Sequence, residues 1–135
     1  MLTITSLYAG LLALLFLALS VRVVQGRSGP QGVGLGDGGN AGLLRRIRGH
    51  GNFAEYTPLS LILLGILELG GTLPVWLLHV LGLTLVVARV LHGIALSFTE
   101  KWFFGRFYGT LLTFILLAVM AALCLWRGIA TLLLV

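Results

Sequence analysis

The chain has 135 residues, of which 59% are hydrophobic and only 10% charged, and its mean hydropathy is +1.08. A soluble domain carries about 25% charged residues, so this composition excludes an ordinary soluble protein and indicates one domain, residues 1–135, in lipid. The formal charge of +5 does not indicate nucleic-acid binding, because the basic residues stand at the ends of apolar runs and not on a solvated face.

Four long apolar segments predict an all-α integral membrane bundle of four helices. We place the helices at residues 2–24, 43–69, 74–97 and 107–134, each with at least the roughly 20 residues that a helix needs to cross a bilayer. Backbone polar groups cannot stay unpaired in hydrocarbon, and alternating strands are absent, so helices are the remaining structure. No basic side chain precedes the first segment, which we interpret as an uncleaved helix and not as a signal peptide.

A glycine-rich polar loop, residues 26–40, separates the first two predicted helices. Within it, Gly34-Leu35-Gly36-Asp37-Gly38-Gly39 has the spacing of a dinucleotide-binding turn. Such a turn must follow a strand and open a βαβ unit. Because this one follows a predicted membrane helix, we do not interpret it as a nucleotide site.

Basic side chains predict the orientation of the chain in the membrane. They gather around the first and third connections, and Arg127 near the end of the last helix is an exception. The residues concerned are Arg27, Arg45, Arg46, Arg48, Lys101 and Arg106. Because basic loops stay in the cytoplasm, both termini are predicted to lie outside it.

Cysteine and histidine usage argues against a metal centre. The chain has a single cysteine, Cys124, which excludes an intrachain disulfide, and we interpret it as a small packing residue. The three histidines, His50, His79 and His92, show no metal-ligand spacing. We therefore predict no metal.

Most of the polar and ionisable residues that could form a functional site lie in a stripe on the second predicted helix. Arg45, Arg48, Asn52 and Glu55 are spaced three, four and three residues apart, which places them on one helical face, and Tyr56 widens the stripe. Ionisable groups at membrane depth must face other helices, another subunit or a polar ligand. One interpretation is a self-neutralising packing network of Arg48, Asn52 and Glu55. The other, which the surplus of arginine favours, is a site for an anionic ligand.

Several polar residues outside the stripe have a role that the sequence only partly defines. Arg89 and His92 lie one turn apart on the third helix, where Arg89 either snorkels to the interface or closes the polar site from the facing helix. Glu68 is predicted to make an interfacial or subunit contact and not to be catalytic. His50 is predicted to be a solvated interfacial residue.

The polar stripe resembles the second helix of the MAPEG family, the membrane-associated proteins in eicosanoid and glutathione metabolism. The shared pattern is Arg-x-x-x-Asn-x-x-Glu-Tyr-x-Pro, matched here by Arg48, Asn52, Glu55, Tyr56 and Pro58. The bacterial branch is similar over further runs, Leu35-Gly36-Asp37-Gly38-Gly39 and Ile47-Arg48-Gly49-His50-Gly51-Asn52-Phe53-Ala54-Glu55-Tyr56.

The resemblance implies a homotrimer that binds glutathione between subunits near the cytoplasmic face. It implies glutathione contacts at matching positions, and we include neighbouring polar residues of the predicted site. The predicted glutathione residues are Arg27, Arg45, Arg48, Asn52, Glu55, Tyr56, Arg89 and His92. Arg106 is the predicted catalytic residue, which stabilises the thiolate, with Lys101 as the alternative for that role.

The predicted function is that of a glutathione transferase acting on lipophilic electrophiles, extended to lipid hydroperoxide reduction, in a bacterial inner membrane. Glutathione is the predicted co-substrate, and membrane lipids and further copies of the chain are the predicted partners. The third helix departs from well-studied eukaryotic members, since His92 and Leu96 stand where those have tyrosines. The alternative is therefore a catalytically silent trimer that binds a lipid or an anionic metabolite, or scaffolds a membrane complex.

Overall fold

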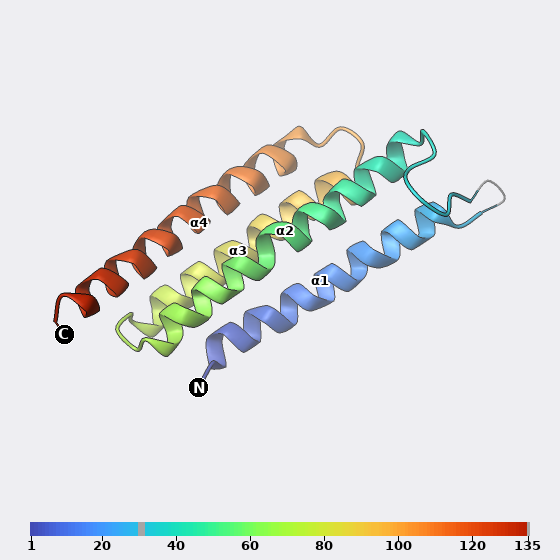
Figure 1. The fold of residues 1–135 in the computed structure, drawn as a ribbon. Helices are drawn as coiled ribbons and strands as arrows, with labels where there is room; N and C mark the ends of the chain where they lie inside the picture. The colour runs from blue at the N-terminus through green and yellow to red at the C-terminus, as the bar shows by residue number, and fades with distance from the viewer. Residues whose placement is uncertain (30–31, 135) are drawn as a thin grey trace.

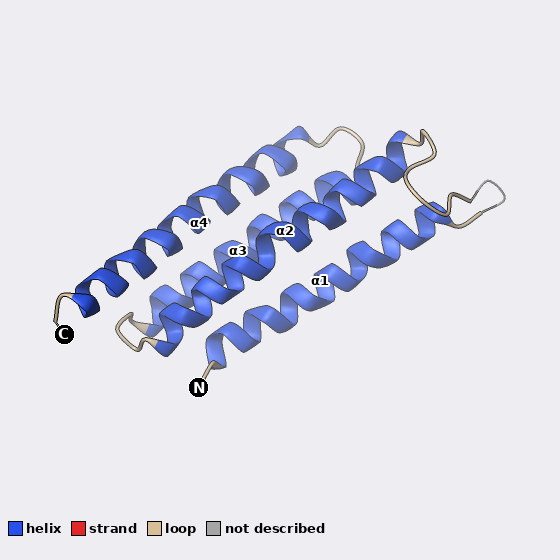
Figure 2. Ribbon diagram, in the orientation of Figure 1, coloured by secondary structure: helices blue, strands red, loops and turns tan. Residues whose placement is uncertain are grey.

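Four long helices lie side by side in the computed structural model, which describes residues 1–29 and 32–134 (Figure 1). They are α1 (Thr3–Arg27), α2 (Ala41–Leu69), α3 (Val75–Ser97) and α4 (Phe103–Leu132). No strand occurs in the described residues (Figure 2), so the predicted all-α class is confirmed. Helices α1, α3 and α4 are long and apolar enough to cross a membrane. Helix α2 has 29 residues, but its polar stripe lowers its hydropathy.

The helices form an open arrangement and not a closed bundle. Helix α1 packs on α2 and α3, and α4 packs on the same pair, while α1 and α4 do not touch within the described chain. Figure 1 shows α1 and α4 on opposite sides of the α2–α3 pair. Both termini lie at one end, and the first and third connections lie at the other. Large apolar side chains are exposed along all four helices, as contact with lipid or another subunit requires.

Helix α1 runs three residues further than the sequence predicted, through Arg27. Its last turn is closed by Ser28, whose backbone N–H and hydroxyl both donate to the carbonyl of Val24, at 3.0 and 2.9 Å. Gly26 and Arg27, which were predicted to begin the loop, therefore belong to α1.

Helix α4 begins four residues earlier than predicted, at Phe103. Aromatic pairs four residues apart lie in contact along its first turns. The rings of Phe103 and Phe107 are stacked with centroids 5.8 Å apart, and those of Phe104 and Tyr108 are tilted with centroids 4.3 Å apart. Such pairs stabilise a helix, which explains why the helix extends into a segment that reads as a connection. Arg106 consequently lies on the first turn of α4.

A glycine lets α4 approach α3 beside the polar region. A Cβ atom added to Gly109 would lie 2.8 Å from the backbone nitrogen of His92 and 2.9 Å from the carbonyl oxygen of Ala88. Small residues allow such close helix packing in membranes. This contact brings Thr113, one turn further along α4, over Arg89 of α3.

Two charged side chains cap helix ends at the face that carries the termini. The carboxylate of Glu68 accepts the backbone N–H groups of Ile4 and Thr5, at 2.8 and 2.7 Å, and the Thr5 hydroxyl at 2.6 Å. Glu68 thus caps the N-terminus of α1 within the same chain. Arg127 donates to the carbonyls of Ile66 and Leu67 at the C-terminus of α2, at 3.3 and 3.4 Å, which gives this basic residue a structural role.

Candidate functional site

The polar stripe of α2 faces outwards at its two most charged positions. Arg48 and Glu55 are both exposed, and neither takes part in a hydrogen bond or ion pair that involves another described side chain. The ion pair found in the described part of the chain joins Arg45 to Glu100 of the third connection, at 3.2 Å. The self-neutralising Arg48–Glu55 network is therefore not formed within one chain.

Arg89 is a buried cation at the centre of the helix packing. Its side chain, on α3, is only 2% exposed, so it does not snorkel to the interface. One terminal nitrogen donates to the side-chain and backbone oxygens of Asn52, at 3.0 and 3.4 Å, and the other donates to the hydroxyl of Thr113. Its Nε has no hydrogen-bond partner. Arg89 thus joins α2, α3 and α4 and meets only neutral acceptors among the described residues.

Tyr56 and His92 surround this buried charge. The guanidinium carbon of Arg89 lies 6.0 Å from the ring centroid of Tyr56, and that ring packs at 5.6 Å against Phe114 of α4. His92 lies one turn beyond Arg89 on α3 and is buried. The structure therefore brings Asn52, Tyr56, Arg89 and His92 to one region, and the exposed Glu55 precedes Tyr56 on α2.

Arg106 lies where two hollows meet at the start of α4. A hollow of about 140 Å³ is lined by Arg45, Lys101 and Arg106 together with the Glu100 carboxylate. A larger hollow, of about 560 Å³, follows the outer face of α4 from Arg106 to Phe114 and is mostly apolar. Because Phe114 also contacts Tyr56, the larger hollow runs from the basic end of the bundle towards the polar region.

Arg27 lies apart from the stripe in the single chain. Its guanidinium donates to the carbonyls of Gly34 and Val33, at 3.1 and 3.4 Å, and so holds the described part of the first loop. No hydrogen bond between Arg27 and the stripe occurs in the described residues.

Two features were not anticipated by the sequence. Thr113 accepts a hydrogen bond from Arg89, and the only hint in the sequence was a hydroxyl residue four positions after Gly109. His50 is half-buried against α1, where its Nε2 lies 3.1 Å from the Ser20 hydroxyl and its ring stacks on Phe16, so it is less exposed than a fully solvated residue.

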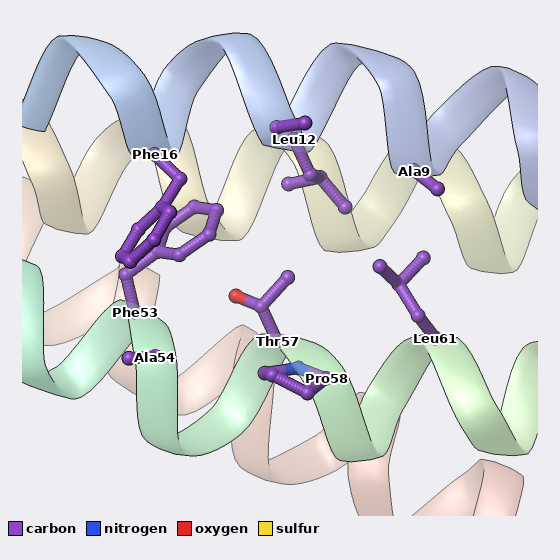
Figure 3. Close-up of a pocket in the computed structure, with 9 residues that line it drawn as sticks. Ala9, Leu12, Phe16, Phe53, Ala54, Thr57, Pro58 and Leu61 are labelled. Atoms are coloured by element: carbon purple, nitrogen blue, oxygen red, sulfur yellow. The ribbon is translucent and has the colours of Figure 1, made fainter.

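A separate apolar hollow of about 340 Å³ lies between α1 and α2 (Figure 3). Phe16 and Phe53 close one end, and Thr57 and Pro58 lie along its α2 side. Its lining includes none of the stripe residues, so we leave it out of the candidate site.

Comparison with known proteins covers nearly the whole chain. The model of the family described as MAPEG family matches residues 5–126. The chain is 35% identical to the inner membrane protein YecN of Escherichia coli strain K12 over 123 residues, which is 91% of each protein. YecN of E. coli O6:H1 strain CFT073 matches to the same extent. No solved structure matches. The matched range contains the α2 stripe, Arg89 and Arg106.

Proposed function

Because this chain belongs to the MAPEG family, we propose that it is a membrane-bound glutathione transferase that acts on lipophilic electrophiles. The observation that carries the proposal is the surplus of positive charge around α2. Among the residues that the structure describes, Arg48 is exposed without a partner and Arg89 is buried without a carboxylate. Glu55 is the one acidic side chain of the stripe. By similarity to YecN, whose name places it in the inner membrane, we assign this protein to a bacterial inner membrane.

The charged groups of glutathione are complementary to those of this site. It carries two carboxylates, an ammonium group and a thiol. Arginine binds carboxylates with two parallel charge-assisted hydrogen bonds, a role suited to Arg45 and Arg48. We expect Glu55 to bind the ammonium group. Arg89 adds a fixed positive charge at the hydrogen-bonded side chain of Asn52. A packing network would need no such surplus of cations.

The chemistry we propose is nucleophilic attack by the glutathione thiolate. The guanidinium of Arg106 beside the sulfur favours the ionised form of the thiol. The thiolate then forms a carbon–sulfur bond to the electrophile, and the displaced group departs with the electron pair of the broken bond. The apolar hollow that runs from Arg106 to Phe114 is open along α4 and suits an electrophile that arrives from the bilayer. With a lipid hydroperoxide, the thiolate would instead attack the terminal peroxide oxygen, the O–O bond would break, and the lipid alkoxide would leave and take up a proton as the alcohol. The resulting sulfenic acid would condense with a second glutathione to give glutathione disulfide and water.

We propose that the complete site forms in a homotrimer. Charged side chains facing lipid at membrane depth are costly, so the exposed Arg48 and Glu55 require a covering surface. A second copy arranged by closed three-fold symmetry supplies one, and Arg27 of that copy is the residue we expect to complete the glutathione site. Cross-linking in mild detergent should stop at the trimer. A monodisperse monomer that still binds glutathione would contradict the trimeric site.

The direct test of the activity is conjugation of glutathione to a chromogenic aryl halide by the purified protein. We expect a rate that depends on both substrates and is lost in the Arg48→Ala variant. Consumption of glutathione with an organic hydroperoxide tests the peroxidase reaction in the same preparation. Absence of turnover with both acceptors would contradict the enzymatic proposal.

A catalytically silent trimer is the second candidate. The observation that favours it lies on α3, where His92 is buried and Leu96 is apolar at the positions that carry tyrosines in well-studied eukaryotic relatives. Such a protein would bind a lipid or an anionic metabolite, or scaffold a membrane complex. Thermal stabilisation by glutathione without turnover would favour ligand binding, and no stabilisation by glutathione would favour a different anion or the scaffold.

A further inference from the structure

A second basic hollow lies at the loop end of the bundle and shares Arg45 and Glu100 with the small hollow beside Arg106. It has a volume of about 200 Å³ and is formed by the end of α1, the start of α2 and the end of α3. Arg22, Arg45 and Arg46 line it, together with Gly42 and Glu100. Arg22 and Arg46 have no part in the proposed glutathione site.

Two of these arginines are held in place by backbone groups. Arg22 donates from Nε and a terminal nitrogen to the carbonyl of Ser97, at 3.3 and 3.0 Å, and its guanidinium carbon lies 4.7 Å from the ring centroid of Phe98. Arg46 donates to the backbone carbonyl of Arg22, at 3.3 Å. The other terminal nitrogen of Arg22 donates to the side-chain oxygen of Gln25, at 3.2 Å. Because a guanidinium carries five N–H donors, two N–H groups of Arg22 remain available after these three bonds, and four remain on Arg46 after its single bond.

The charge around this hollow is unbalanced. Glu100 is its one carboxylate, is 80% exposed, and pairs with Arg45. Neither Arg22 nor Arg46 has a carboxylate within ion-pairing distance in the part of the chain that the structure describes. Clustered guanidinium groups match an oxyanion such as phosphate, which accepts several charge-assisted hydrogen bonds at once.

The position of the hollow indicates a lipid as the source of the phosphate. It lies at the ends of the helices, next to an exposed aromatic segment that includes Phe98, Trp102 and Phe103. Aromatic side chains of this kind mark the membrane interface, and basic pockets between membrane helices bind anionic headgroups. We propose that this hollow binds the phosphate of an anionic phospholipid headgroup, with the acyl chains along the apolar surface of the bundle.

The test is lipid binding by the full-length protein, measured by native mass spectrometry and by thermal melting in mild detergent. Phosphatidylglycerol is the probe, and inorganic phosphate tests the free anion. Phosphatidylcholine is the zwitterionic control, since its phosphate is neutralised by the choline ammonium and the headgroup has no net charge. We expect phosphatidylglycerol to bind and to raise the melting temperature, while the other two do neither. In an Arg22→Gln/Arg46→Gln double variant, affinity for phosphatidylglycerol should fall by about tenfold or more, because charge-assisted hydrogen bonds are lost.

An Arg27→Gln/Lys101→Gln double variant is the matched control, since it removes the same charge at the same end of the bundle outside this hollow. It should retain the lipid. Because Arg22 also ties α1 to α3, Arg46→Gln alone is a second variant, and it should weaken lipid binding while the helices remain packed. Equal loss of lipid in the matched control would overturn the proposal, and so would stabilisation by inorganic phosphate equal to that by phosphatidylglycerol. The lipid measurements use no glutathione, and Arg22 and Arg46 are not part of the proposed glutathione site. Failure of the lipid proposal can therefore be distinguished from failure of the proposed enzyme activity.

Discussion

The guanidinium of Arg89 donates a hydrogen bond to the side-chain oxygen of Asn52 over 3.0 Å and so joins α3 to the polar face of α2. Arg48 lies one turn before Asn52 and Glu55 lies one turn after it, and both are exposed. The hydrogen-bonded Arg89 and Asn52 therefore hold α2 and α3 together at the site. Arg48 and Glu55 remain available to contact a ligand or another subunit.

Loss of the Asn52 side-chain oxygen should destabilise the protein without ligand. In Asn52→Leu, the buried guanidinium loses its side-chain acceptor on α2, and the free energy of unfolding should fall by about 1–3 kcal/mol. Removing the charge as well, in Asn52→Leu/Arg89→Met, should recover part of this loss because no cation is left unsatisfied. Thermal melting of the single and double variants measures the coupling. Strictly additive losses would show that the two side chains act independently.

Glu68 should stabilise the first turn of α1 through its three hydrogen bonds. Glu68→Ala leaves this helix N-terminus without a side-chain cap, so we expect faster amide exchange at Ile4 and Thr5 and a loss of about 0.5–2 kcal/mol of stability. Glu100→Ala is the matched control, because an exposed ion pair contributes only about 0–1 kcal/mol. Equal exchange at the α1 terminus in both variants would disprove the capping role.

Orientation can be tested with a reporter that is active only in the cytoplasm. Both termini lie at the end opposite the first and third connections (Figure 1), and the basic residues around those connections predict that the termini lie outside. A reporter fused to the C-terminus should therefore be silent, and one inserted after Gly36 should be active. Strong cytoplasmic signal from the C-terminal fusion would reverse the orientation.

Arg106 should act on the thiolate more than on glutathione binding. In Arg106→Ala, we expect the conjugation rate to fall more than glutathione affinity, because the guanidinium interacts mainly with ionised sulfur. The ultraviolet thiolate signal of the complex should then appear at higher pH. Lys101→Ala is the comparison, since Lys101 lines the smaller hollow but not the larger one. If Lys101→Ala alone moves the thiolate signal, Lys101 holds the role assigned to Arg106.

Apolar runs were sufficient to predict four helices, because membrane depth permits few other structures. Their ends were harder to place. The stacked rings of Phe103 and Phe107 extend α4 backwards into a segment whose Trp, Lys and Arg residues resemble a connection. Helical spacing was also sufficient to place the polar residues of α2 on one face, because the period of the helix alone determines which residues share a face.

Contacts between helices could not be predicted in the same way. The sequence left Arg89 either snorkelling or closing the site, since only the packing of α3 on α2 and α4 determines which acceptors it reaches. Glu68 was expected to make an interfacial or subunit contact. Its capping of Thr5, which lies 63 residues away in sequence, could not be predicted from spacing along the chain. His50 was expected to be a solvated interfacial residue, and its partial burial depends on Phe16 and Ser20 of α1.

The most direct test of the ligand site is calorimetric titration of glutathione into the wild-type protein, Arg48→Ala and Glu55→Gln, with ligand-free melting of all three. If Arg48 binds a ligand carboxylate, its loss should lower affinity by about one to two orders of magnitude, since a charge-assisted hydrogen bond contributes roughly 1.5–3 kcal/mol. Glu55→Gln should also weaken binding, through the ammonium group of the ligand. Oligomeric state and ligand-free melting should change little, because neither side chain has a partner within the described chain. Collapse of the ligand-free protein in either variant, with normal glutathione affinity in the fraction that stays folded, would contradict the ligand site and assign the stripe to subunit packing.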